Sequence, residues 1–185
     1  QELIVGHPLS QELRRDKPIL EAKVIQILQD LLQILEFVHN HNVIHRDIKP
    51  SNIIRRYSDG KLVLIDFGTV KEVTTKLPED EGKTRFTIGI GTEGYAPNEQ
   101  CAGRPRFNSD IYAVGIIGIK ALTGVPPQDF QTDPKTGEFV WQHEAEVSPE
   151  LAAILSKMVV YDFTQRYQSV SEVRLALDDL LFSVS

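Results

Sequence analysis

Residues 43–52 read VIHRDIKPSN, and this stretch joins two apolar residues to a dense group of polar ones. Val43 and Ile44 are typical of a short strand that enters a core. An acid, a lysine and an amide follow within a few positions, as Asp47, Lys49 and Asn52. Hydrogen-bonding groups gathered in a loop beside a core strand indicate a functional site.

The composition bounds the class of protein. The chain has 185 residues, enough for one domain or for one lobe of a larger one, and 41% are hydrophobic. The net charge is −6 and there is no broad basic stripe, so we expect no nucleic-acid partner. No apolar run reaches the ~18 residues of a membrane span, so we expect no membrane segment in this chain. The single cysteine, Cys101, excludes an intrachain disulfide, and we expect a cytoplasmic location.

The hydrophobic pattern predicts a mainly α fold with short β-hairpins. We expect a long amphipathic helix from Pro18 to about residue 41, because apolar residues recur there every three or four positions. Short strands are expected at 43–44, 52–56 and 61–65, with a turn at 58–60. Residues 1–5 read as a strand end or linker that Gly6, His7 and Pro8 break, and residues 124–147 read as irregular. Three more helices are expected, with N-caps at the following residues: Ser109 (helix 110–123), Ser148 and, in a capping box with Glu172, Ser169.

A second polar group follows the predicted strand LVLI, at Asp66-Phe67-Gly68. If the strands on either side of the turn pair, Asn52 and Asp66 lie at the same end of the hairpin. A carboxylate and an amide oxygen are ligands suited to Mg²⁺. Asp47 can accept a proton from an attacking hydroxyl, and Lys49 supplies positive charge for a phosphoryl group.

Four stretches in order resemble eukaryotic-type (Hanks-type) Ser/Thr protein kinases of bacteria. HRDIKPSN (45–52) is similar to their catalytic loop and DFG (66–68) to their metal motif. GTEGYAPNEQ (91–100) resembles the end of their activation segment, and SDIYAVG (109–115) the start of their central helix. The resemblance implies the large C-terminal lobe of a protein kinase over residues 1–185. Within it we expect these segments: a hinge at 1–9, a catalytic loop at 45–52, an activation segment at 66–99 and a buried central helix at 109–123.

The resemblance also implies roles in catalysis. Asp47 would be the catalytic base, Lys49 would contact the γ-phosphate of ATP, and Thr92 would contact both of them. Asn52 and Asp66 would hold Mg²⁺, with Mn²⁺ as a possible substitute. The protein substrate would be phosphorylated on Ser or Thr.

Nucleotide binding and regulation are implied in the same way. The backbone of Glu2 and Leu3 would bind adenine at the hinge, with Gln1 as gatekeeper and Ile54 beneath the ring. Arg46 and Lys71 would face a phosphothreonine, for which Thr87 is the best candidate.

Three residues are expected to have architectural roles. Asp110 would hold the backbone of the catalytic loop, and Glu99 and Arg166 would form a buried ion pair. His45 is expected to be a packed histidine that supports the catalytic loop, and the other four histidines to have surface or packing roles.

The sequence departs from the family pattern in several places. Asn98 stands where the family usually has proline, and residues 124–147 lack a clear substrate-docking helix. No glycine-rich loop and no V-A-I-K lysine precede the hinge segment. The chain opens with Gln1, inside an apolar run, so we expect it to begin partway through a larger protein, with the N-terminal lobe missing and residues 1–185 alone essentially inactive.

Two other classes of function stay open at this point. A pseudokinase-like binding or regulatory module would use the lobe without chemistry, although the joint presence of Asp47, Lys49, Asn52 and Asp66 argues against it. A small-molecule phosphotransferase would share an Asp…Asn loop, but we would not expect it to carry the GT…PNE segment with Glu99 and Arg166.

Overall fold

The computed structural model describes residues 4–66, 71–72 and 94–183. Helices make up about half of it. The α-helices are α1 (Glu21–Asn40), α2 (Asn98–Cys101), α3 (Phe107–Thr123), α4 (Pro149–Met158) and α5 (Val170–Ser183). The strands are β1 (Gly6–Pro8), β2 (Val43–Ile44), β3 (Ile53–Arg56), β4 (Leu62–Leu64) and β5 (Lys71–Glu72). Short 3-10 turns are formed by Leu9–Gln11, Pro50–Asn52, Pro127–Asp129 and Gln142–Glu144. The predicted mainly α class with short β-hairpins is confirmed.

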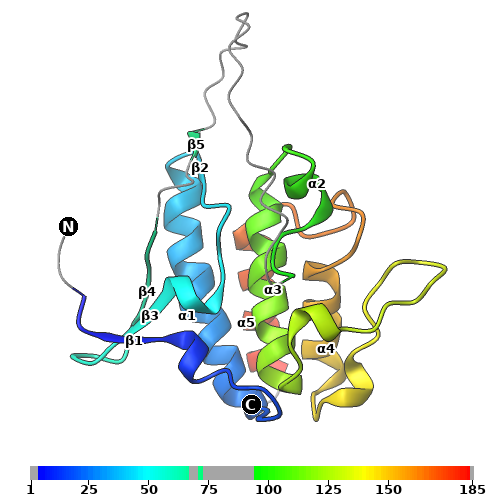
Figure 1. The fold of residues 1–185 in the computed structure, drawn as a ribbon, viewed down its shortest axis with the longest axis horizontal. Helices are drawn as coiled ribbons and strands as arrows, with labels where there is room; N and C mark the ends of the chain where they lie inside the picture. The colour runs from blue at the N-terminus through cyan, green and yellow to red at the C-terminus, as the bar shows by residue number, and fades with distance from the viewer. Residues whose placement is uncertain (1–3, 67–70, 73–93, 184–185) are drawn as a thin grey trace, which may run out of the picture.

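The helices pack around α3. Figure 1 shows α1 and α4 on either side of α3, with α5 behind. Nearly every side chain of α3 is buried, including Ile111, Ile116, Ile117 and Ile119. α1 contributes the apolar face that the sequence predicts, from Val24 to Val38. α3 is therefore the axis of the core, and the catalytic loop lies near its N-terminal end.

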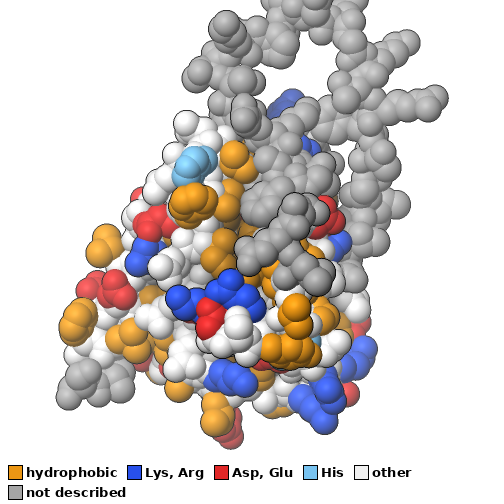
Figure 2. All heavy atoms as spheres, turned by 90° about the vertical axis from the view of Figure 1, so that its left-hand side faces the viewer, with side chains coloured by type: hydrophobic (Ala, Val, Ile, Leu, Met, Phe, Trp, Pro, Cys, Tyr) orange, Lys and Arg blue, Asp and Glu red, His pale blue; other side chains and the backbone are white. Residues whose placement is uncertain are grey.

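The strands form two small antiparallel sheets, of which β1-β3-β4 lies to the left of α1 in Figure 1 and β2–β5 at its upper end. One has the order β1-β3-β4, and the other pairs β2 with β5. The turn at 58–60 joins β3 to β4 as predicted, with Gly60 in the left-handed region at φ 71°. Figure 2 looks onto the left-hand side of Figure 1, where charged side chains of both signs are interspersed with hydrophobic ones.

Residues 6–8 correct one expectation. Gly6, His7 and Pro8 do not break a strand but form β1, paired with Arg56, Arg55 and Ile54 of β3. Pro8 is tolerated because it ends an edge strand. A Cβ at Gly6 would lie 2.2 Å from the carbonyl oxygen of Arg55, so glycine permits the close approach of the two backbones.

Two helix starts also differ from the prediction. Pro18 is not the first residue of α1, which begins at Glu21, because the amide of Ile19 donates to the Ala121 carbonyl oxygen (2.7 Å). This tertiary bond keeps the preceding segment extended. Ser109 is not the N-cap of α3: the helix begins at Phe107, and the Ser109 hydroxyl accepts from the Arg106 amide (3.0 Å) one turn inside it.

The other helix starts agree better with the sequence. The Ser148 hydroxyl accepts from the Leu151 amide (3.3 Å) and caps α4 as predicted. Ser169 accepts from the Glu172 amide (3.3 Å) at the start of α5, while the Glu172 carboxylate bonds the amide of Gln168 rather than that of Ser169. Residues 124–147 form only 3-10 turns and a single bridge between Thr132 and Phe139, in keeping with the predicted irregular segment. None of the helices in the described residues is long and apolar enough to cross a membrane.

Candidate active site

The polar residues of the catalytic loop converge in the structure. Lys49 Nζ lies 3.1 Å from Asp47 Oδ1. The Asn52 amide nitrogen donates to Asp47 Oδ2 (2.7 Å) and to the Asp47 carbonyl oxygen (2.9 Å). Asp47 and Lys49 keep a third and a quarter of their side chains exposed, whereas Asn52 is buried. A rigid amide thus holds an accessible carboxylate that has a cation beside it.

The loop owes its shape to a buried carboxylate on α3. Asp110, 1% exposed, accepts from the amides of His45 (2.8 Å, to Oδ2) and Arg46 (2.9 Å, to Oδ1). His39 Nε2, at the end of α1, lies 2.9 Å from the same Oδ2. Three groups from two segments therefore converge on one carboxylate, which compensates the cost of burying its charge.

Two residues of the motifs have backbones that non-glycine residues rarely adopt. Arg46 has φ 71° and Asp66 has φ 63°. Strain of this kind costs on the order of 1–3 kcal/mol per residue and is typical of functional sites. At Arg46 it is held from both sides, since Asp110 accepts from the amide and Gln100 of α2 donates to the carbonyl oxygen (2.7 Å).

His45 supports the loop from within. It is fully buried, and its Nδ1 accepts from the Asp47 amide (3.3 Å). Its ring also interacts with the backbone of Ile65, next to Asp66. Burial lowers the pKa of His45 below its usual value, although Asp110 and other nearby acids oppose the shift. A neutral, packed imidazole therefore joins the catalytic loop to the end of β4.

The β3–β4 hairpin brings Asn52 and Asp66 to the same end, as the sequence predicts. Ile53 pairs with Leu64, and the Ile65 amide donates to the Asn52 carbonyl oxygen (2.9 Å). Because Asn52 Nδ2 makes two bonds to Asp47, the side-chain Oδ1 is the atom left for another ligand. An amide oxygen and a carboxylate oxygen at one end of a hairpin suit Mg²⁺, which keeps several waters. The donor chemistry of this pair fits the metal.

Some expected residues fall outside the described part of the chain. These are Gln1, Glu2, Leu3, Phe67, Gly68, Thr87 and Thr92. For Lys71 only the backbone is described, in β5 opposite Ile44. Ile54 lies half-buried in β3, between Pro8 of β1 and Val63 of β4. Among the described residues, Arg46 Nε is buried without a hydrogen-bond partner, which leaves it a donor for a group elsewhere.

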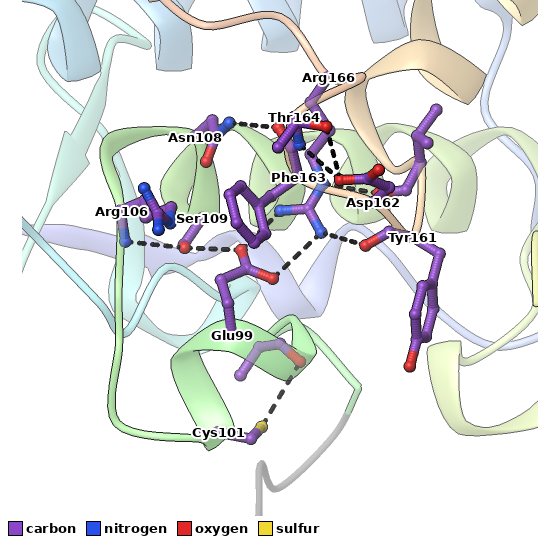
Figure 3. Close-up of polar contacts among 12 residues, drawn as sticks. Glu99, Cys101, Arg106, Asn108, Ser109, Tyr161, Asp162, Phe163, Thr164 and Arg166 are labelled. Atoms are coloured by element: carbon purple, nitrogen blue, oxygen red, sulfur yellow. Dashed lines mark hydrogen bonds and ion pairs between the residues drawn. The ribbon is translucent and has the colours of Figure 1, made fainter.

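Behind the loop, Glu99 and Arg166 form a buried bidentate ion pair (Figure 3). Their nitrogen–oxygen distances are 2.6 and 3.2 Å, and the side chains are only 7% and 1% exposed. Arg166 also donates to the carbonyl oxygens of Val160 (2.6 Å) and Tyr161 (3.2 Å) and lies over the ring of Tyr112. Burial raises the pKa of Tyr112 to about 12. α2 is thereby fixed to the loop before α5, and Gln100 of the same helix reaches the catalytic loop.

Sequence reasoning missed three contributors to this arrangement: His39, Gln100 and Ser109. His39 follows Leu35 by four positions on α1, so its place on the buried side could have been read from the helical period. Ser109 donates to Glu99 Oε1 (2.8 Å), and Gln100 donates to the Arg46 carbonyl oxygen. No local sequence pattern predicts either bond. Cys101 of α2 is exposed, with its thiol 3.8 Å from the Ala96 carbonyl oxygen.

Comparison with known proteins identifies the same family that the sequence motifs resemble. The model of the family described as "Protein kinase domain" matches residues 1–175. "Serine/threonine-protein kinase PknA" of Nostoc is 43% identical over 96% of this chain and 32% of its own length. "Serine/threonine-protein kinase C" of Synechocystis is 41% identical over 96% and 33%, and PknB of Mycolicibacterium smegmatis is 32% identical over 95% and 29%. The chain spans about a third of the length of these curated relatives.

Proposed function

The chain belongs to the protein kinase family, and from this premise we propose that it forms the C-terminal lobe of a Ser/Thr protein kinase. The proposed reaction is transfer of the γ-phosphate of ATP to Ser or Thr on a protein substrate. Names of relatives from cyanobacteria and mycobacteria support the Ser/Thr assignment.

The observation that carries the proposal is the cluster of Asp47, Lys49 and Asn52. In the proposed step, the substrate hydroxyl oxygen bonds to the γ-phosphorus while the bond to ADP breaks, and Asp47 takes the proton. Asn52 Nδ2 holds Asp47 Oδ2 at 2.7 Å, so the carboxylate does not have to reorient during the reaction. Lys49, 3.1 Å from Oδ1, is close enough to place its charge on the phosphoryl group.

Asn52 and Asp66 are the residues proposed to hold Mg²⁺. When bound, the ion neutralises charge on the phosphates. Nucleotide contacts through Glu2, Leu3 and Ile54, and a contact of Thr92 with the base, remain parts of the proposal. Regulation by a phosphothreonine, with Thr87 as the candidate, is also part of the proposal. The buried Nε of Arg46 has no hydrogen-bond partner among the described residues, which supports a phosphate as the partner of that side chain.

A second lobe is also part of the proposal. The letters G-x-G-x-x-G occur once, at 89–94 (GIGTEG), within the predicted activation segment rather than ahead of the hinge. No V-A-I-K lysine is present. Because positioning and electrostatics provide most of the catalysis, residues 1–185 alone should transfer phosphate very poorly.

The test is Mg²⁺- and ATP-dependent transfer of labelled phosphate to protein substrates by the longer protein that includes this chain, with the 185 residues alone run in parallel. Asp47→Asn should abolish transfer by the longer protein. Robust transfer by residues 1–185 alone would contradict the proposed division into lobes. If the longer protein binds ATP yet transfers nothing, the pseudokinase alternative takes precedence. Aminoglycosides and small alcohols, assayed beside proteins, would reveal a small-molecule phosphotransferase.

A further inference from the structure

A polar pocket lies where the C-terminal end of α1 meets the N-terminal ends of α3 and α5. It has a volume of about 170 Å³ and is separate from the Asp47 cluster. The residues that carry the argument are His39, Asn40, Asn42, Phe107, Gln168 and Ser171. We call this cavity the α1–α5 pocket. Nothing in the proposed phosphate transfer uses it.

His39 connects the pocket to the catalytic loop. Its Nε2 lies 2.9 Å from Asp110 Oδ2, so the proton of a neutral ring belongs on Nε2, where a carboxylate accepts it. Nδ1 is then an acceptor, and it has no hydrogen-bond partner among the residues that the structure describes. The ring of Phe107 packs edge-on against His39, with centroids 4.9 Å apart, and fixes its orientation. A ligand that donates to Nδ1 would therefore meet a ring already in place.

The size of the pocket limits the ligand. A cavity of roughly 150 Å³ in another protein holds one benzene molecule. The α1–α5 pocket, at about 170 Å³, thus has room for a single six-membered ring with small substituents. The half-buried Phe107 supplies an aromatic wall for a flat molecule.

The polar lining indicates the chemistry of that ring. Asn40 and Asn42 bring two carboxamides, and a carboxamide pairs two-fold with an adjacent donor and acceptor on a heterocycle edge. The Gln168 amide nitrogen already donates to the carbonyl oxygens of Phe163, Thr164 and Arg166, so only its side-chain oxygen is left to accept from a ligand. Glu36, also in the lining, is already compensated, since it accepts from Ser171 (3.1 Å) and pairs with Arg174. A neutral ligand is therefore favoured over a cation.

We propose that the α1–α5 pocket binds a small neutral heterocycle of the pyrimidine-base kind, and that the bound molecule acts on the catalytic loop through His39 and Asp110. A hydrogen bond donated to Nδ1 polarises the ring and strengthens the bond from Nε2 to Asp110. Asp110 in turn accepts from the amides of His45 and Arg46. The pocket is thus two contacts away from the backbone that precedes Asp47. The site itself does not depend on the proposed kinase activity.

The experiment is a titration of the ¹⁵N-labelled chain with cytosine, followed by two-dimensional NMR of backbone amides and histidine ring nitrogens. Millimolar affinity is the expectation for so small a ligand. We expect saturable shifts at Asn40, Asn42, Ser171 and His39 Nδ1. The amides of His45 and Arg46 should shift with the same midpoint. Benzene, of similar size but without polar groups, should leave His39 Nδ1 unchanged.

Variants separate binding from coupling. Asn40→Trp and Ser171→Trp, both at exposed positions in the lining, should block the pocket and abolish all the shifts. Leu175, exposed on α5 like Ser171 but outside the lining, provides the matched control, and Leu175→Trp should bind cytosine normally. His39→Gln should retain the shifts at Asn40 and Ser171 and lose those at His45 and Arg46.

Three results would overturn the inference. The first is the absence of a saturable shift in the wild-type chain, and the second is binding that survives both tryptophan variants. The third is binding that shifts Asn40 and Ser171 but leaves His45 and Arg46 unchanged, which would remove the link to the catalytic loop. Loss of phosphate transfer in the longer protein bears on the proposed function alone, because none of these readouts measures activity.

Discussion

Replacing Arg166 by methionine should destabilise the fold more than any change at an exposed ion pair. The guanidinium makes two bonds to Glu99 and one each to the carbonyl oxygens of Val160 and Tyr161. After the substitution, the Glu99 carboxylate, 7% exposed, would retain only the hydroxyl of Ser109 as a described partner. Breaking a buried pair in this way costs about 3–5 kcal/mol of unfolding free energy.

The converse change should cost less. In Glu99→Gln the guanidinium keeps both carbonyl acceptors and the ring of Tyr112, 4.7 Å away. We expect a loss of about 1.5–3 kcal/mol, the range for a hydrogen bond to a charged group. The double variant Glu99→Leu with Arg166→Met should recover much of the loss, because it leaves no unpaired charge in the interior.

The assay is urea unfolding of the chain followed by circular dichroism, with the free energy extrapolated to water. Arg15→Met is the control, since Arg15 pairs with Asp129 at 3.0 Å while 65% of its side chain is exposed. That variant should lose about 0–1 kcal/mol. The reasoning is refuted if Arg166→Met lies within about 1 kcal/mol of wild type, because the pair would then not be desolvated.

Three further predictions concern the loop and a helix end. Asp47→Asn should abolish phosphate transfer by the longer protein while changing the unfolding free energy by less than about 1 kcal/mol, since the residue is partly exposed; comparable loss of stability and activity would argue against a catalytic role. Because burial lowers the pKa of His45 below its usual 6.5, the unfolded chain takes up a proton that the native chain does not as pH falls through 6.5. The stability of wild type relative to His45→Asn should then fall by up to about 1.4 kcal/mol per pH unit below that pH, and equal slopes in denaturation series would contradict this. Gly124→Ala should cost about 1–3 kcal/mol, because Gly124 has φ 70° and a Cβ there would lie 2.8 Å from the Lys17 amide nitrogen; Gly60→Ala, with φ 71° but open space, should cost less in the same unfolding assay.

The local patterns predicted most of the fold. The three- and four-residue period located α1, and the turn at 58–60 located the β3–β4 hairpin. The resulting register brought Asn52 and Asp66 to the same end of the hairpin, so the metal-binding expectation could be drawn from the residues themselves. The Glu99–Arg166 contact was of another kind: the two residues are 67 positions apart, and only the resemblance to protein kinases suggested it.

The parts that the sequence did not predict depend on tertiary hydrogen bonds. Pro18 is a good first residue for a helix, but the Ile19 amide is engaged by Ala121, so α1 starts later. Ser109 is a good N-cap, but its hydroxyl bonds Glu99 and the Arg106 amide, and α3 extends one turn further. The Ile19 partner is remote in sequence, whereas the Ser109 partners lie three and ten positions earlier; in both cases a specific hydrogen bond overrides local propensity.

Asp110 unites the stability of the core with the geometry of the site. The left-handed backbone at Arg46 persists only because the Asp110 carboxylate and Gln100 hold its two peptide groups. Removing Asp110 would release that strain and leave the His45 and Arg46 amides without their acceptor, so stability and activity would fall together. Such a variant cannot distinguish an architectural residue from a catalytic one. His39 touches the same carboxylate from the outside, 2.9 Å away, and its replacement leaves the two amide bonds in place. Variation at His39 is therefore the way to perturb the loop without unfolding it.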